Sequence, residues 1–300
     1  MLDFSTRVRC QEQLDNGRVP DEEVRKALLD LRRFNRFFGS KRHLLEALKK
    51  EVSDRGLTQL SVLDIASGSC DLPVAILDWA RQRRLKARVF ALEYQHRHLS
   101  LFLEELAEYS GLHPFCADVF HMPLKGQTFD FVTCCHFLHH LTEGQTVELL
   151  SSMSRWARRA MIVSDLERQS LPYYFFRIFS RLLTTCSVSR NDGLASIRQS
   201  FRKQEVKRMA GQAGLETFTV EQLWPFRLLL VAEASASVTE RVAACLRCGD
   251  VSSVTATASG FLSFAKTPRE PETHSCNVLH SPYYGIHFKR VVDFGEGQPS

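Results

Sequence analysis

The sequence predicts an α/β protein built on a mostly parallel, seven-stranded sheet. Short apolar runs alternate with helical patterns through the middle of the chain, which is typical of β-α-β units whose sheet is covered on both faces. Two further apolar runs flank Pro225 and favour an antiparallel hairpin at the C-terminal edge of the sheet. Two helical patterns precede the first strand, so we expect an N-terminal helical cap.

The expected strands follow from runs of branched and aromatic residues. The first strand ends at Asp64, and the others are expected at 87–94, 113–118, 129–135, 160–165, 215–220 and 226–232. Helices are expected from Asp21 to a break at Gly39, from there to about 52, from Pro73 onward, over 96–109, after Thr142 and over 203–213. Thr142 and Gln145 form a capping box. The stretch around 190–193 is polar and is predicted to be a loop.

This pattern divides the chain into three parts. Residues 1–55 form the helical cap, of which 1–20 are polar and are expected to be ordered only by docking. Residues 56–234 carry the strand and helix alternation. Residues 235–300 lose all periodicity and are rich in Ser, Thr, Pro and Gly, so we expect a weakly structured or disordered tail.

Composition excludes several classes of protein. The 300 residues are 44% hydrophobic with a net charge of +5, which suits one large core and is too weakly basic to indicate nucleic-acid binding. A basic stretch over 25–50 is interpreted as a solvated helix face, with an RNA or membrane-surface patch as the alternative. No signal peptide and no membrane-spanning run is visible, so we expect a cytoplasmic protein.

The nine cysteines are odd in number and lie mostly in apolar runs, which favours reduced core residues over a disulfide framework. Cys245 and Cys248 alone have metal-ligand spacing. They lack a second clean pair downstream, so we expect no metal site.

The segment from Asp64 to Asp71 is the centre of the predicted site. A strand runs into a loop of small residues, Ala66-Ser-Gly-Ser-Cys70, and a helix follows. Backbone N–H groups at such a helix start can approach a nucleotide-like ligand closely. Two more carboxylates, Glu93 and Asp118, follow the next two strands, and the carboxyl ends of parallel strands share one crevice. These residues are therefore expected to converge on one ligand.

Five segments resemble the ordered motifs of class I S-adenosylmethionine-dependent methyltransferases, whose fold is Rossmann-like. They are 62–73, 91–94, 116–124, 129–141 and 161–165. The match is closest to small-molecule enzymes of the ubiquinone/menaquinone and phenolic O-methyltransferase-like groups, and it covers about 21–232. The segments 31–39 and 190–201 also resemble one bacterial-type branch.

This resemblance implies that the cofactor is S-adenosyl-L-methionine. The residues expected to bind it are Asp64, Ala66, Ser67, Gly68, Asp71, Glu93, Tyr94, Asp118, Val119 and Cys135. Glu93 would hold the ribose hydroxyls and Asp118 the adenine amine. Ala66 and Cys70 replace glycines that are common in the family. Ala66 is tolerable if its φ stays negative, whereas Cys70 is expected to narrow the loop and to weaken cofactor binding.

The expected catalytic residues are His139, His140 and Asp165. Methyl transfer to a phenol requires positioning and a base for the hydroxyl proton, and His136, His139 and His140 follow the fourth strand, beside the expected methyl group. Asp165, at the end of the fifth strand, would orient one of these histidines. Packing or exposed histidines remain the alternative.

The expected function is O-methylation of a small hydrophobic acceptor that is phenolic or quinol-like. The aromatic stretch 172–183, interrupted by Arg177 and Arg181, suits a roof over an apolar acceptor, a membrane-surface contact or plain core packing. C-methylation of a quinone precursor and a non-catalytic scaffold that binds a partner are the alternatives. Nucleic acid is not an expected partner, and the oligomeric state is left open.

Overall fold

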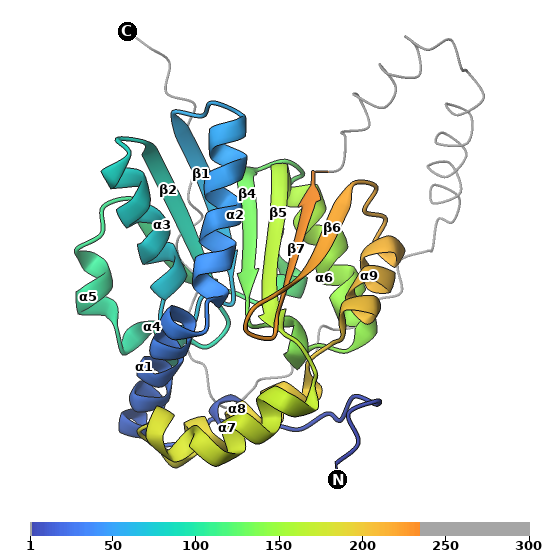
Figure 1. Ribbon diagram of the computed structural model, residues 1–300. Helices are drawn as coiled ribbons and strands as arrows, with labels where there is room; N and C mark the ends of the chain where they lie inside the picture. Colours follow the sequence, from blue (N-terminus) through green and yellow to red (C-terminus); the bar gives the residue numbers. More distant parts are fainter. Residues whose placement is uncertain (1, 235–300) are drawn as a thin grey trace, which may run out of the picture. The chain divides into compact units, whose positions relative to one another are not determined.

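The computed structural model describes residues 2–234 of the chain. The predicted tail and the cysteine pair at 245 and 248 lie outside the described residues. The described part has one seven-stranded sheet in the order β3-β2-β1-β4-β5-β7-β6 (Figure 1). Its strands are β1 (Gln59–Ile65), β2 (Lys86–Glu93), β3 (Leu112–Cys116), β4 (Phe129–Cys135), β5 (Ala157–Leu166), β6 (Phe218–Leu223) and β7 (Arg227–Glu233).

The first five strands are parallel, and β7 runs antiparallel to both β5 and β6. The predicted mixed sheet with its C-terminal hairpin is therefore confirmed. The strand order reverses direction between β1 and β4, because β2 and β3 extend to one side of β1 while β4 and β5 extend to the other. Such a switch point opens a crevice at the carboxyl ends of the strands.

Helices cover both faces of this sheet. They are α1 (Asp21–Phe37), α2 (Ser40–Asp54), α3 (Asp71–Gln82), α4 (His96–Ser100), α5 (Leu103–Ala107), α6 (Glu143–Trp156), α7 (Ser170–Leu183), α8 (Ser187–Gln199) and α9 (Lys203–Gln212). Short 3-10 helices occur at Leu14–Asn16, Val119–His121 and Leu138–His140. The helices α1, α7 and α8 gather at the end of the sheet to which the arrowheads of β4 and β5 point (Figure 1).

Successive side chains along each strand point to opposite faces of the sheet, and each face has its own hydrophobic core. Val62 in β1 faces a cluster shared with α2 and α3, while its neighbour Leu63 faces a cluster shared with α6 and α9. Successive side chains of a strand point to opposite faces, so a sheet buried on both sides must be apolar in both registers. The cap helix α2 contributes Leu44 and Leu48 to the first of these cores. The domain boundary at residue 55 stays a prediction.

Two helix predictions are wrong. The segment 96–109 forms two short helices because the chain turns at Phe102, whose buried ring lies 4.1 Å from the guanidinium carbon of Arg32. The predicted loop at 190–193 lies inside α8. The buried face of α8 is polar, and Asp192 on it accepts hydrogen bonds from the backbone N–H groups of Gln13 and Leu14. A hydrophobic pattern therefore does not reveal this helix. The capping box at Thr142 and Gln145 is confirmed.

The N-terminal arm, residues 2–20, is ordered by docking, as predicted. Buried Arg168, just beyond β5, donates to the backbone carbonyls of Phe4 and Ser5 and pairs with Glu205 of α9 at 2.7 Å. Arg7 of the arm donates to the carbonyls of Leu141 and His139. The arm is thus bound to the segment that follows β4.

Replacing Arg168 with Met should lower the free energy of unfolding by about 3 kcal/mol, because Glu205 and several buried carbonyls lose their donor. The figure lies at the low end for a broken buried ion pair, since the Glu205 side chain is 26% exposed. Urea denaturation measures it. Arg83→Met, at an exposed arginine, is the matched control and should change stability by less than about 0.5 kcal/mol. Equal effects of the two substitutions would show that Arg168 is not an anchor.

Candidate functional site

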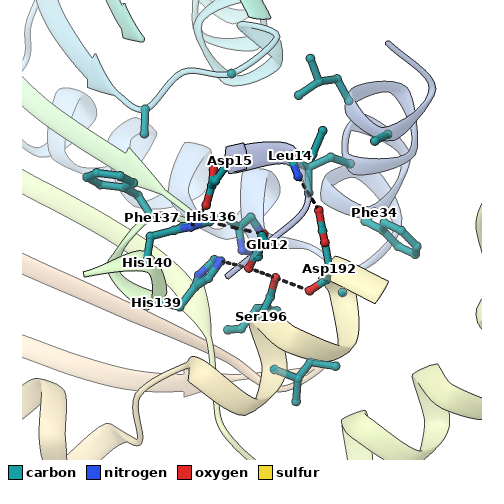
Figure 2. A pocket seen from close by; sticks show the side chains of 18 of the residues that line it. Glu12, Leu14, Asp15, Phe34, His136, Phe137, His139, His140, Asp192 and Ser196 are labelled. Atoms are coloured by element: carbon teal, nitrogen blue, oxygen red, sulfur yellow. Dashed lines mark hydrogen bonds and ion pairs between the residues drawn. The ribbon is translucent and has the colours of Figure 1, made fainter. Parts of the chain in front are cut away.

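A cavity of about 840 Å³ lies at the carboxyl ends of the parallel strands. Its wall combines residues that follow β1, β2, β3, β4 and β5 with residues of α1, α7 and α8 and of the N-terminal arm (Figure 2). This volume is in the upper part of the range of about 300–1,000 Å³ that is typical of small-molecule sites. The cavity is therefore large enough for a cofactor and a second small molecule.

Glu93, at the end of β2, is buried in the wall of this cavity. Burial raises the pKa of its carboxyl group, but hydrogen bonds from His98 and from the backbone N–H groups of Gln95 and Gly68 outweigh this and hold the pKa below its usual value. Glu93 is therefore a carboxylate at neutral pH, and its oxygens face a cavity as hydrogen-bond acceptors.

Asp118 and Val119 follow β3 on the same wall. One Asp118 oxygen caps the following 3-10 helix by accepting from the N–H of Phe120 at 3.0 Å, and the other lies 2.9 Å from Nδ1 of His121. The side chain is 39% exposed, so it keeps access to the cavity. Tyr94 also lines the cavity and is largely exposed.

The loop after β1 has a left-handed backbone at Ala66, Gly68 and Cys70, with φ values of 56°, 54° and 59°. The condition under which Ala66 would replace glycine at little cost, a negative φ, is therefore not met. The loop turns sharply because its N–H groups must meet acceptors: Gly68 donates to Glu93, and Ser67 donates to the carbonyl of Leu92. A left-handed residue that is not glycine is strained by roughly 1 kcal/mol. Ala66 and Gly68 line the cavity.

Cys70 does not narrow the cavity, which corrects the expectation for this residue. Its side chain is fully buried and packs in the core with Leu28 and Leu72, away from the cavity wall. Burial raises the pKa of its thiol well above the usual value, so it stays neutral. The replacement of a family glycine at this position fills space between α1 and α3 rather than space for a ligand.

Four predicted cofactor residues, Asp64, Ser67, Asp71 and Cys135, lie behind the wall rather than in it. Ser67 donates its hydroxyl hydrogen to Asp64. Asp71, at the start of α3, accepts from Asn35 at 3.2 Å and lies 3.5 Å from Nζ of Lys41, so it connects α3 to the cap helices. Cys135 packs against the core beneath β4.

Asp64 is buried beneath the loop, where it accepts hydrogen bonds from the hydroxyl groups of Thr133 and Ser67 at 2.7 and 2.8 Å. Burial raises the pKa of Asp64 to about 7, because these two hydrogen bonds, which lower it, do not replace the lost water and because the carboxylates of Asp71 and Glu93 lie nearby. Asp64 therefore supports the loop from below.

His139, which lines the cavity, and Asp165 form a buried pair. Nδ1 of His139 lies 2.7 Å from Oδ1 of Asp165, and the backbone N–H of His139 donates to Oδ2. Burial raises the pKa of Asp165, but the neighbouring His139 and His136 outweigh it and hold this pKa well below its usual range. The ionised Asp165 fixes the ring of His139, whose other nitrogen, Nε2, lies 3.6 Å from Glu12.

The other two histidines have opposite properties. Burial lowers the pKa of His136, despite its contact with Asp165 at 3.8 Å. For His140 burial acts in the same direction, but hydrogen bonding to Asp15 and the charge of Glu12 dominate and raise the pKa to about 9. His140 is therefore a cation at neutral pH and does not suit the role of a base in this state. Both line the cavity.

Sequence reasoning missed Glu12, Asp15, Asp192 and Ser196, which lie beside these histidines (Figure 2). Glu12 belongs to a polar N-terminal arm that gave no periodic signal. Asp192 and Ser196 lie in the segment 190–201, whose resemblance to one bacterial-type branch was the available signal. Their importance depends on the packing of α8 against the arm.

Aromatic side chains also line the cavity. They include Phe34, Phe38, Phe137, Phe175, Phe176 and Trp224. Phe34 of α1 meets Phe176 of α7 with ring centroids 5.6 Å apart. An acceptor bound beside these rings would thus contact apolar side chains and the charged groups around His139 and His140.

Residues 62–160 match a family model described as a methyltransferase domain. The match covers less than half of the chain and identifies this segment as a methyltransferase domain. The prediction of a methyltransferase is thereby confirmed. A search of curated proteins finds no significant match.

Solved structures agree with this fold. A methyltransferase from Aquifex aeolicus, described as dependent on S-adenosylmethionine, is 16% identical with a TM-score of 0.52, and the match covers 73% of this chain and 100% of that one. Human N-acetylserotonin methyltransferase, solved in complex with S-adenosylmethionine, is 13% identical with a TM-score of 0.51, and the match covers 75% of this chain and 63% of that one. These likenesses concern the fold alone.

Stability should fall as pH rises through the interval in which only the unfolded chain loses the Asp64 proton. The unfolded pKa is about 4 and the folded pKa about 7, so folding of the methyltransferase with neutral Asp64 becomes less favourable across this window and levels off above it. Asp64→Asn removes this contribution, because Asn does not ionise. The variant should therefore gain stability relative to wild type as the pH rises from about 4 to about 7.

Urea denaturation of both proteins across this pH range tests the expectation. Asp54→Asn, at an exposed residue of α2, is the matched control and should run parallel to wild type. A stability difference between Asp64→Asn and wild type that does not change with pH would contradict the raised pKa.

Proposed function

We propose that this methyltransferase transfers a methyl group from S-adenosylmethionine to an oxygen of a small, hydrophobic, phenolic or quinol-like acceptor. One observation carries the proposal: a single cavity is lined by Glu93 and Asp118, by aromatic rings and by His139, which is paired with Asp165. The part with the two carboxylates, the first end, is proposed to bind a nucleoside, and the part with the rings and His139, the second end, an aromatic alcohol.

The first end fits the cofactor in three respects. Ionised Glu93 offers acceptor oxygens to the ribose hydroxyls, and Asp118 with Val119 offers the same to the adenine ring. A Cβ on Gly68 would meet only Leu28, at 4.0 Å, and glycine leaves this space open in the cavity wall. Tyr94 and Ala66 border the same space, while Asp64, Ser67, Asp71 and Cys135 support it from behind.

The second end would position the acceptor. S-adenosylmethionine supplies an activated methyl group on a sulfonium, and transfer is an in-line displacement that depends on alignment. The aromatic wall excludes water and holds a flat, apolar molecule. His139, oriented by Asp165, is proposed to face the reacting oxygen, with His140 beside it. O-methylation is favoured over C-methylation because His139 and His140 line the same cavity as the aromatic rings and can contact a hydroxyl group of the acceptor.

The acceptor is proposed to reach the cavity from an anionic membrane surface. No helix in the described residues is long and apolar enough to cross a membrane. However, α7 exposes an apolar face whose members are Leu171, Phe175, Ile178, Phe179 and Leu182. Arg177 and Arg181 on the same helix are also exposed and complement anionic lipid headgroups.

The exposed face of α7 continues into the cavity. Leu171, Phe175 and Trp224 are all exposed and also line the cavity, so the rim and the interior form one apolar surface. A lipid-soluble quinol or alkylphenol is the class of molecule that such a route suits. The cytoplasmic location stays a prediction.

Glu93→Gln should weaken binding of S-adenosylhomocysteine by at least about tenfold, because a hydrogen bond to a charged acceptor contributes roughly 1.5–3 kcal/mol. Isothermal titration calorimetry measures the dissociation constant. Glu104→Gln, at an exposed residue of α5, is the matched control and should bind like wild type. Absence of binding to wild type at millimolar ligand would refute the proposed cofactor site.

Mass spectrometry of products from phenol and quinol substrates separates O- from C-methylation.

The pair of substitutions Ile178→Glu and Leu182→Glu should abolish flotation with phosphatidylglycerol vesicles, because these side chains are 70% and 85% exposed and would have to bury a charge on contact. Leu103→Glu, at an exposed leucine of α5, should still float like wild type. If wild type stays at the bottom of the gradient, or if all three proteins float, the membrane contact through α7 is wrong.

A further inference from the structure

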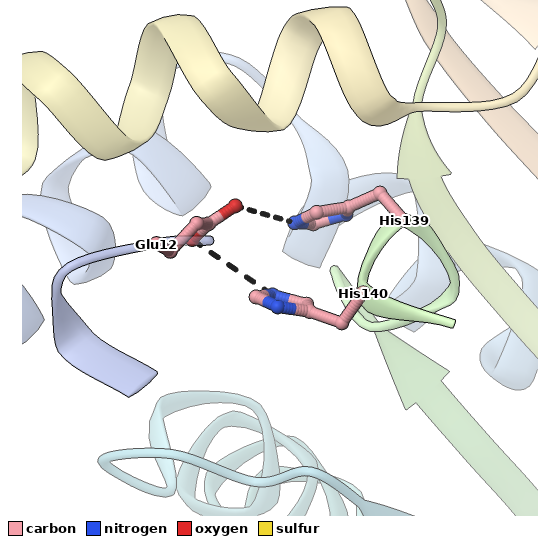
Figure 3. A group of neighbouring side chains, drawn as sticks. All are labelled: Glu12, His139 and His140. Atoms are coloured by element: carbon pink, nitrogen blue, oxygen red, sulfur yellow. Dashed lines mark ion pairs between the residues drawn. The ribbon is translucent and has the colours of Figure 1, made fainter. Parts of the chain in front are cut away.

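We infer that Glu12, His139 and His140 form a binding site for one divalent transition-metal ion. The three side chains converge in the cavity wall, with Glu12 facing the two imidazole rings, which lie side by side (Figure 3). Nε2 of His139 lies 3.6 Å from Oε1 of Glu12, and Nε2 of His140 lies 3.9 Å from Oε2. Neither the proposed cofactor site nor the proposed acceptor site requires a metal.

These separations exceed a hydrogen bond but are close to the spacing of metal ligands. With ligand distances of about 2.0–2.2 Å, the atoms at two corners of a tetrahedral site are roughly 3.4 Å apart. Two histidines and one carboxylate are a donor set that zinc and iron accept in open sites. The ligand atoms of the three groups all lie within 4.8 Å of one another, so side-chain rotations that move them by about 1 Å would bring all three into ligation.

The surroundings of both histidines support ligation more strongly than the distances do. Nδ1 of His139 lies 2.7 Å from Asp165, and Nδ1 of His140 lies 3.0 Å from Asp15. In metal sites the second ring nitrogen of a ligating histidine commonly donates to a carboxylate, which orients the ring and increases its basicity. Here both rings have this partner, and both Nε2 atoms are directed at the same glutamate.

Glu12 is supported in the same way. Its side chain is almost fully buried, and Oε1 accepts hydrogen bonds from Ser196 at 2.6 Å and Gln199 at 2.5 Å. These donors, both from α8, fix the carboxylate. A second candidate group, His136 with His139 and Asp165, is less suitable because a hydrogen bond of 2.7 Å already occupies Nδ1 of His139.

Carboxyl and guanidinium groups both lie near the two imidazoles, and the charges of Arg7 and Arg227 act on Asp165. The carboxyl groups of Glu12, Asp15 and Asp165 surround the two imidazoles within the described residues. A proton on His140 or a divalent ion can each balance these groups, and the two alternatives give different experimental results. Because the three ligands line the cavity, the remaining coordination position faces it, as in catalytic rather than structural zinc sites.

The ion would bind the acceptor's oxygen at this open position. A phenol that coordinates a divalent ion releases its proton to solvent more readily, and the phenolate then forms the new O–C bond as the S–C bond of the sulfonium breaks. This role rests on the proposed function, whereas binding of the ion itself does not.

The full-length protein, freed of metal with a chelator and then dialysed, is titrated with Zn²⁺ by competition against a chromophoric chelator. We expect one ion per chain at this site, with affinity reduced at least tenfold in both Glu12→Gln and His140→Asn. The matched controls Glu104→Gln and His96→Asn change exposed residues and should bind like wild type. Circular dichroism melting verifies that each variant folds, and either folded variant suffices.

Substitution with Co²⁺ identifies the type of ligand. This is needed because the cysteines of the chain can also bind zinc. Visible absorption of the Co²⁺-loaded wild type should show nitrogen and oxygen ligation without the charge-transfer bands of thiolate. No uptake of Zn²⁺ by wild type, unchanged affinity in a folded site variant, or thiolate bands alone would each overturn the inference and leave a protonated ionic cluster. Binding of S-adenosylhomocysteine to the chelator-treated protein is measured in parallel, so failure of the metal site and failure of the cofactor site are distinguishable.

Discussion

Carboxylates buried at the ends of the parallel strands determine the conformation around the cavity. A charge removed from water must be matched by hydrogen bonds, and each carboxylate obtains them from a different source. Glu93 takes them from His98 and from the backbone N–H groups of Gln95 and Gly68, so the loop after β1 contributes one of the donors that keep Glu93 ionised. Asp165 takes them from the backbone and ring of His139. Asp64 has only two hydroxyl donors, and its raised pKa reflects this weaker match.

The opposite wall of the cavity depends on a part of the chain far away in sequence. Arg7 donates to the carbonyls of Leu141 and His139, while Glu12, five residues further on, faces the rings of His139 and His140. The arm and the histidine segment are therefore held together twice, once through backbone and once through side chains. Because α8 supplies the donors to Glu12, the position of this carboxylate is fixed by three separate segments of the chain.

Elements with apolar buried faces could be predicted from the sequence, whereas elements with polar buried faces could not. The seven strands and their order along the chain follow from runs of branched residues, and the positions of Glu93 and Asp118 follow from where those strands end. The helix α8 was predicted as a loop because its inward face carries Ser189, Asp192 and Ser196. Glu12 gave no local signal at all. Its surroundings arise only when the arm, α8 and the segment after β4 meet, and no pattern within one segment encodes such a meeting.

A single helix, α7, connects the chemistry of the cavity with the exposed apolar face. On its inner side Phe176 packs so closely on Gly193 of α8 that a Cβ there would lie 2.6 Å from the ring, so the two helices can approach only because residue 193 has no side chain. That approach brings Asp192 and Ser196 to the arm and leaves Ile178 and Leu182 pointing to solvent. The same packing therefore builds the polar end of the cavity and exposes the apolar surface beside its rim. An acceptor with a long apolar part and one hydroxyl oxygen fits this arrangement. Its apolar part would contact the exposed face of α7 and the bilayer, and its oxygen would contact the polar cluster in the cavity.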